Sequence, residues 1–195
     1  MMNLIRLEFL KLRKKTRSWL GPILVFWLIM IAYPLTVEFL QDKLEIGFFS
    51  VLWIAILISM MLATEDIFTE DFNDGFLELM VIQNSSFSLG VSIKVFAYWS
   101  LIGFPVSFLG FIFSYGTTGN FSLSISIFPL ALISSYIFLN LFALGNSLSL
   151  NKGSVLGAIV TMPLALPVLI VLGKSLIALP VSYTHLRAHE TTDHL

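Results

Sequence analysis

Six carboxylates stand close together in this chain, between two long apolar segments. They are Glu65, Asp66, Glu70, Asp71, Asp74 and Glu78. A carboxylate at the centre of a bilayer costs about 2.5–3.5 kcal/mol, whereas a leucine or phenylalanine there gains only about 0.5 kcal/mol. The acidic run must therefore lie in water or at a membrane surface, where the flanking segments hold it. A loop in this position is a natural docking surface for a partner.

Cysteine and histidine offer little further chemistry. The chain has no cysteine, which excludes disulfides and thiolate metal sites. The three histidines are His185, His189 and His194, and the first two have the spacing of a metal or haem ligand pair. However, VSYTHLRAHET within this stretch resembles the translation of a sequencing adapter. We interpret residues 181–195 as a non-native tail, and therefore expect no metal site and no directly bound cofactor.

Two other candidate sites are weak. Methionine and tyrosine are the remaining side chains that can hold a haem axially. The candidate methionines are Met60, Met61, Met80 and Met162, which we interpret as packing residues. Gly173-Lys174-Ser175 resembles the end of a P-loop, but the glycine required five residues earlier is Val168. We therefore expect neither an ATPase site nor an enzyme.

The composition is that of an integral membrane protein. Of the 195 residues, 57% are hydrophobic and 12% are charged, with a mean hydropathy of +0.91, whereas soluble domains carry about 25% charged residues. Apolar runs close to the ~20 residues that cross a bilayer as a helix occupy residues 20–37, 47–63, 91–115, 122–144 and 155–172. We predict an all-α, polytopic helical bundle that forms one domain over residues 1–180. Residues 1–19 have the apolar spacing of an amphipathic helix on the membrane surface.

Basic residues set the expected orientation. Those before the first span are Arg6, Lys11, Arg13, Lys14, Lys15 and Arg17. Because Lys and Arg gather on the cytoplasmic side of spans, we predict a cytoplasmic N-terminus. Alternating spans then place the acidic run in the cytoplasm and residues 116–120 outside. The lipid bilayer is an expected partner, and nucleic acid is not.

Prolines and small residues within the predicted spans are candidate hinges or packing surfaces. The prolines are Pro34, Pro105, Pro163 and Pro167, and the small residues are Gly103, Ser107, Gly110, Gly153 and Gly157. A proline removes a backbone donor and tends to kink a helix. It is also common in membrane helices, so ordinary packing is favoured over a hinge. The small residues give flat faces for close helix contact or for a subunit interface.

Two side chains near the start of the third predicted span are open to more than one interpretation. Lys94 can extend its stem to the membrane surface, or its ammonium can pair with Glu78; we favour the first. Trp99 lies deeper in the same span. It suits either an interfacial anchor or a packing residue, and we favour packing.

Three blocks of the chain carry a family resemblance. They are IAYPLTV at the end of the first span, VLWIAILISMMLATEDIFTEDFNDGFLELMVIQNSSFSLGVSIKVFAYW around the acidic run, and the later LSLNKGSVLGAIVTMPLALPVLI. The middle block, with Phe-x-Asp-Gly-x-Leu-Glu followed by Lys-x-x-x-x-Trp, is the most specific. From Leu4 to about Gly173 the chain resembles the cytochrome c maturation protein CcmB, or haem exporter protein B, family of ABC transporter membrane subunits.

The resemblance implies an exporter-type permease of the bacterial inner membrane. Such a protein works with a separate ATP-binding subunit and a haem-handling membrane protein, and a second copy of the permease is a further candidate partner. It would couple ATP hydrolysis by its partner to haem export or to release of a haem-loaded chaperone. Family members have a sixth span, which implies that native sequence continues past Pro180. The alternatives are a permease for a polysaccharide or drug, and a membrane scaffold that transports nothing.

The resemblance also implies that the acidic run docks the ATP-binding subunit. The residues concerned are Glu65, Asp66, Glu70, Asp71, Phe72, Asp74, Gly75, Leu77 and Glu78. Asp74-Gly75 interrupts a pattern in which Phe72, Phe76, Leu79 and Met80 would form one apolar helix face. A short interfacial helix can insert into a cleft on the ATPase and tilt the adjacent spans. The alternative is a solvated turn that only separates two helices.

Overall fold

The computed structural model describes residues 10–11, 15–37, 44–65, 67–82, 87–150, 156–157 and 159–175, and within them every regular element is a helix. The elements are α2 (Thr16–Val37), α3 (Leu44–Thr64), α4 (Thr69–Asn73), α5 (Phe76–Ile82), α6 (Phe87–Tyr98), the π-helix η2 (Trp99–Gly103), α7 (Phe104–Thr118), α8 (Phe121–Leu148) and a last helix, Ile159–Ser175. In the described residues four helical stretches are long and apolar enough to cross a membrane, and Ile159–Ser175 is a shorter apolar helix. The predicted fold class, an all-α polytopic membrane bundle, is confirmed.

The first span begins earlier than the sequence predicts. α2 starts at Thr16, so residues 16–19, assigned from the sequence to a surface helix, belong to the membrane-crossing helix. Trp19 packs against the core of the bundle, which draws this end of the helix inward, while Arg17 stays exposed. Leu10 and Lys11 are helical. Residues 1–9 and 12–14 of the predicted surface helix lie outside the described part of the chain.

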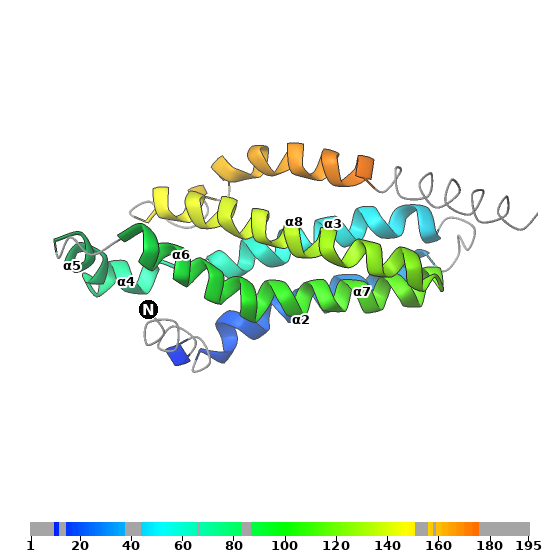
Figure 1. The fold of residues 1–195 in the computed structure, drawn as a ribbon, viewed down its shortest axis with the longest axis horizontal. Helices are drawn as coiled ribbons and strands as arrows, with labels where there is room; N and C mark the ends of the chain where they lie inside the picture. Colours follow the sequence, from blue (N-terminus) through cyan, green and yellow to red (C-terminus); the bar gives the residue numbers. More distant parts are fainter. Residues whose placement is uncertain are drawn as a thin grey trace, which may run out of the picture.

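α3 is the central helix of the bundle. It packs against α2, α7 and α8 (Figure 1). Its inner face includes Leu52, Ile56 and Met60, all fully buried. A helix that is apolar on most of its circumference lies in the interior of a bundle. The position of Met60 in this core is that of a packing residue.

The third span is one long helix that reaches beyond the membrane. α6, η2 and α7 run continuously over Phe87–Thr118, which is 32 residues and about 48 Å at 1.5 Å per residue. The hydrocarbon layer is only about 30 Å thick, so the helix must project from it. Figure 1 shows α6 at the same end of the bundle as α4 and α5, and this is the end where the acidic run lies.

The irregularity in the third span lies upstream of Pro105. Pro105 has no N–H to donate to the carbonyl of Leu101, and a π-helical segment, Trp99–Gly103, comes just before it. π-Helical turns are rare and occur often at functional sites. The sequence predicts a proline kink here, but it does not predict this change of hydrogen-bond register.

α7 and α8 form an antiparallel hairpin with a short turn. Gly119 follows α7 with φ at +63°, a left-handed conformation that suits glycine. Asn120 then caps α8, because its Oδ1 accepts a hydrogen bond from the Leu123 N–H at 3.2 Å. The turn is therefore confined to Gly119 and Asn120, whereas the sequence predicts a loop over residues 116–120.

Two glycines bring α8 close to the residues just before the last helix. A Cβ atom on Gly145 would lie 2.7 Å from the backbone oxygen of Gly157, and a Cβ on Gly157 would lie 2.6 Å from the backbone oxygen of Gly145. Only glycine permits backbones to approach this closely. Gly157, a candidate packing residue, thus lies against α8, while Gly153 lies outside the described residues.

Candidate functional site: an elbow anchored by a buried ion pair

The acidic run folds into two short helices joined by a sharp turn. α4 and α5 are separated by Asp74-Gly75, where Gly75 has φ at +68°. Glycine adopts this left-handed conformation without strain, so the Asp-Gly pair fixes the angle between the two helices. We name residues 69–82 the elbow. It lies at one end of the bundle, after α3 and before α6 (Figure 1).

The elbow presents large apolar side chains on its outer surface. Phe72, Phe76, Leu79 and Ile82 are 37%, 40%, 53% and 78% exposed, respectively. We name these four residues the elbow face. Contiguous exposed apolar side chains with a polar rim mark interaction surfaces. The sequence predicts an apolar helix face from four residues, and three of them, Phe72, Phe76 and Leu79, lie on this surface.

Charged and half-buried residues border the elbow face. Asp74 and Glu78 are exposed, and within the described residues neither belongs to an ion pair. Leu77 is half-buried and lines a cavity of about 510 Å³ together with residues of α6 and α8. Glu65 is exposed at the end of α3, and Asp66 lies outside the described residues. The predicted docking residues therefore do not all share one surface.

Asp71 is buried, although the sequence assigns it to the exposed docking run. It is 4% exposed, and its Oδ2 accepts a hydrogen bond from Nζ of Lys94, which is 8% exposed. The expectation that Lys94 snorkels to the surface is therefore wrong, and its partner is Asp71 rather than Glu78. The physical reason is that α6 extends beside α4, so the ammonium finds a carboxylate nearby and does not need to reach water.

Two buried apolar residues shortly precede Asp71 in the chain, and one of them contacts the ion pair. Ile67 and Phe68 are 1% and 5% exposed, and Nζ of Lys94 lies 5.9 Å from the centroid of the Phe68 ring, within range of a cation–π interaction. Removing one partner of a buried pair leaves an uncompensated charge and costs about 3–5 kcal/mol. Ile67-Phe68 is an apolar pair inside the acidic run, and it is the feature of the sequence that indicates a buried segment. An interpretation based only on the number of charges in the run misses this feature.

In the described part of the chain, every ion pair has its acidic member on α4. Nζ of Lys11 lies 3.8 Å from Oδ1 of Asp71, and Nζ of Lys15 donates to Oε2 of Glu70 at 2.5 Å. Nζ of Lys11 also lies 5.4 Å from the centroid of the Phe76 ring. The basic segment before α2 and the acidic elbow therefore lie at the same end of the bundle. α4 is tied both to the entry of α2 and, through Asp71, to α6.

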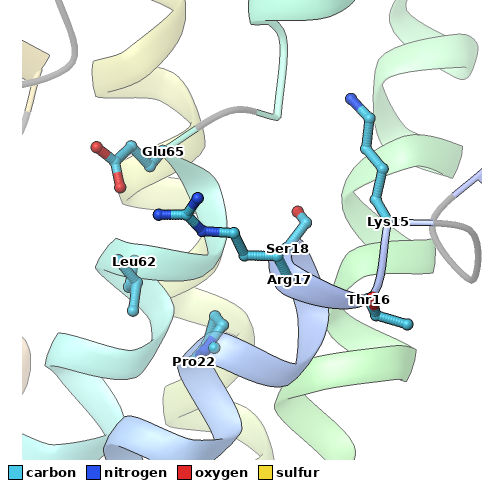
Figure 2. Close-up of a pocket in the computed structure, with 8 residues that line it drawn as sticks. Lys15, Thr16, Arg17, Ser18, Pro22, Leu62 and Glu65 are labelled. Atoms are coloured by element: carbon cyan, nitrogen blue, oxygen red, sulfur yellow. The ribbon is translucent and has the colours of Figure 1, made fainter.

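A cavity of about 760 Å³ opens near the elbow, between the start of α2 and the end of α3. Lys15, Arg17 and Glu65 supply charges at its walls, and Pro22 and Leu62 supply apolar surface. Figure 2 shows Arg17 and Glu65 extending toward the same space, while Lys15 points away from them. Because cations and a carboxylate share these walls, the cavity does not select an anion. We assign it no ligand.

η2 lies where several spans meet. It contacts α2, α3 and α8. Nε1 of Trp99 donates to Oγ of Ser135 at 3.0 Å, and the Trp99 ring packs edge-on against Tyr136 with the centroids 5.6 Å apart. Gly103 and Ser107 lie on the same face, where Oγ of Ser107 is 3.3 Å from Oγ of Ser135. Trp99 is thus a packing residue between helices, as its favoured interpretation expects.

The other candidate hinge residues lie away from the elbow. Pro34 is near the far end of α2, and Pro163 and Pro167 are exposed on the last helix. The three histidines lie outside the described residues. Within the part of the chain that the structure describes, no group of three or more His, Cys, Asp or Glu is placed to hold a metal ion.

Comparison with known proteins gives a consistent result. The profile of the CcmB protein family matches residues 1–186, which extends past the start of the segment interpreted as a non-native tail. The chain is 28% identical over 174 residues to "Heme exporter protein B" of Haemophilus influenzae, covering 87% of this chain and 77% of that protein. It is 30% identical over 169 residues to the protein of the same name from Pseudomonas aeruginosa, covering 83% and 75%. This multi-pass membrane protein therefore belongs to the CcmB family.

Proposed function

We propose that this protein is the membrane subunit of an ABC transporter complex for cytochrome c maturation, and that its elbow docks the ATP-binding subunit. The elbow face carries this proposal, because exposed apolar side chains on short helices are the anchors by which helices enter a groove on a partner. The ion pairs of α4 support it, since they hold the docking helices against the spans. The name of the relatives, "Heme exporter protein B", supports haem as the transported species.

In this proposal the protein is a mechanical element and not an enzyme. The partner subunit binds and hydrolyses ATP, and movement of the elbow rearranges the spans to export haem or to release a haem-loaded chaperone. A haem-handling membrane protein and a second permease copy are the further proposed partners. We place the complex in the bacterial inner membrane with the N-terminus in the cytoplasm, because basic residues crowd the chain before the first span. The basic segment and the elbow lie at the same end, which supports a cytoplasmic elbow.

We expect that this subunit holds no haem by its own side chains. Before Val181 the chain has neither histidine nor cysteine, and these are the usual axial ligands together with Met and Tyr. Met60 is fully buried among the core side chains of the bundle, which is the position of a packing residue. The protein purified without partners should therefore lack haem absorption. A haem spectrum that disappears on substitution of one residue before Val181 would contradict this expectation.

The docking proposal is tested by co-purification with the ATP-binding subunit of an ABC transporter complex for cytochrome c maturation. Phe76→Glu together with Leu79→Glu places two carboxylates on the elbow face, where both native side chains are substantially exposed. We expect the affinity for the ATP-binding subunit to fall by about tenfold, or about 1.4 kcal/mol, the scale of a single important interface anchor. Asp71 is unsuitable for this test because it is buried.

A matched control distinguishes docking from general damage. Phe121→Glu alters an aromatic side chain that is 58% exposed at the start of α8, at the opposite end of the bundle from the elbow. This variant should retain the ATP-binding subunit. Undiminished co-purification of the Phe76→Glu, Leu79→Glu protein would refute docking at the elbow face. Binding without any effect of this subunit on the ATPase rate would favour a scaffold.

A further inference from the structure

We propose that Lys94 and Asp71 are a positioning pair that passes movement of the elbow to η2 in the third span. This inference rests on the proposed docking of an ATP-binding subunit at the elbow. It adds the route by which a displacement at α4 reaches the interior of the membrane.

The Lys94–Asp71 ion pair connects the elbow to the third span. Asp71 belongs to the five-residue helix α4, and Lys94 belongs to α6 of the third span. Both side chains are nearly inaccessible, at 6% and 10% exposure. A buried, hydrogen-bonded ion pair resists separation far more than an exposed one, because each charge left alone would lack both water and a partner. α4 and α6 are therefore held together at this point.

α6 leads directly into η2, the irregular part of the third span. Lys94 precedes η2 by little more than one turn, and α6 continues into Trp99 without a break. A helix transmits an axial shift along its length, and a π-helical turn is a place where its register can change. η2 contacts α2, α3 and α8, so a shift of α6 reaches three neighbouring spans at once.

The Lys15–Glu70 pair of α4 differs from the Lys94–Asp71 pair in its exposure. Lys15 and Glu70 are 48% and 49% exposed, and Lys15 precedes α2 rather than belonging to a span. An exposed pair on flexible side chains is screened by water and salt. Such a pair does not hold two helices together strongly enough to transmit movement from one to the other. Glu70→Gln is therefore a matched control that removes a charge from the same helix without breaking the link to α6.

A single introduced thiol can report movement at η2, since the chain has no cysteine. Ser100 lies in η2, is half-buried, and donates its Oγ to the carbonyl of Phe96 at 2.9 Å. In the complex with the ATP-binding subunit, we expect ATP to change the rate at which a small maleimide labels the Ser100→Cys variant. A change of about fivefold or more is expected, the lower end of typical coupling between two sites.

Two variants then test the link on that background. Asp71→Asn removes one charge, and the double variant Asp71→Leu, Lys94→Met replaces the pair with apolar side chains and keeps the contact packed. The double variant should bind the ATP-binding subunit as the parent does, and both variants should lose the effect of ATP on labelling. Glu70→Gln should keep the effect, and so should the conservative variant Lys94→Arg.

The outcomes separate this inference from the docking proposal. If the parent protein does not bind the ATP-binding subunit, docking itself fails. If it binds but ATP leaves labelling at residue 100 unchanged, no movement reaches η2 and the inference is overturned. If the double variant binds and still responds to ATP, the ion pair is not the link and the inference is overturned while docking stands.

Discussion

Lys94→Met should lower the free energy of unfolding by about 3–5 kcal/mol, the usual cost of leaving one member of a buried ion pair without its partner. Asp71 is 4% exposed, and the substitution leaves it only Lys11, whose Nζ is 3.8 Å from its Oδ1. Asp71→Asn should cost a similar amount, because Lys94 would then face the Phe68 ring and a neutral amide. Reversible unfolding in mixed micelles, followed by tryptophan fluorescence, measures both effects.

The double variant Asp71→Leu, Lys94→Met completes the thermodynamic cycle. Replacing a whole buried ion pair with apolar side chains of similar volume is often neutral or stabilising, so this protein should be within about 1 kcal/mol of the parent. Lys15→Met breaks the exposed pair with Glu70 and should change stability by about 0–1 kcal/mol. Equal losses for Lys94→Met and Lys15→Met would show that burial of the Asp71 pair has no energetic importance.

Gly145→Leu should destabilise the protein by about 3 kcal/mol, the upper part of the range for overpacking an interface between helices. A Cβ at this position would lie 2.7 Å from the Gly157 backbone oxygen and 2.3 Å from Cγ2 of Thr161. A backbone oxygen cannot turn aside as a side chain can, so the last helix must move away from α8. The same unfolding measurement gives the loss in stability.

Gly116→Ala is the matched control for the glycine contact. A Cβ on Gly116, within α7, would meet nothing within 4 Å. Alanine also favours a helix interior over glycine by about 0.5–1 kcal/mol, so this variant should be neutral or slightly more stable. A wild-type stability for Gly145→Leu would mean that the last helix does not pack on α8 at these glycines.

The spans could be predicted because hydropathy is a local property. Each apolar run near the length of a membrane crossing corresponds to a described helix, and the acidic run separates α3 from α6. The ends were predicted less well, because packing extends some helices beyond their apolar runs. α2 begins at Thr16 since Trp19 packs on the core, and α6 begins at Phe87 beside the elbow.

The candidate site was predicted in outline only. The Asp74-Gly75 turn and the apolar pattern around Phe76 and Leu79 were visible in the sequence, because turn chemistry and helical spacing involve neighbouring residues. The roles of Asp71 and Lys94 were not visible. Hydropathy excludes every carboxylate of the acidic run from lipid and does not distinguish one from another. Whether a given carboxylate is exposed or paired depends on whether α6 places a lysine beside it.

The sequence alone determined that this is a membrane protein with an acidic segment kept outside the hydrocarbon, because the transfer free energy of each side chain depends on its own chemistry. Its residues also carried the resemblance to the CcmB family. Only the tertiary structure decided which acid is buried, which lysine pairs with it, where the π-helical turn lies and which glycines touch. These features depend on the distances between helices that are far apart in the chain. Hydropathy and helical spacing do not specify such distances, and they are set when the spans pack.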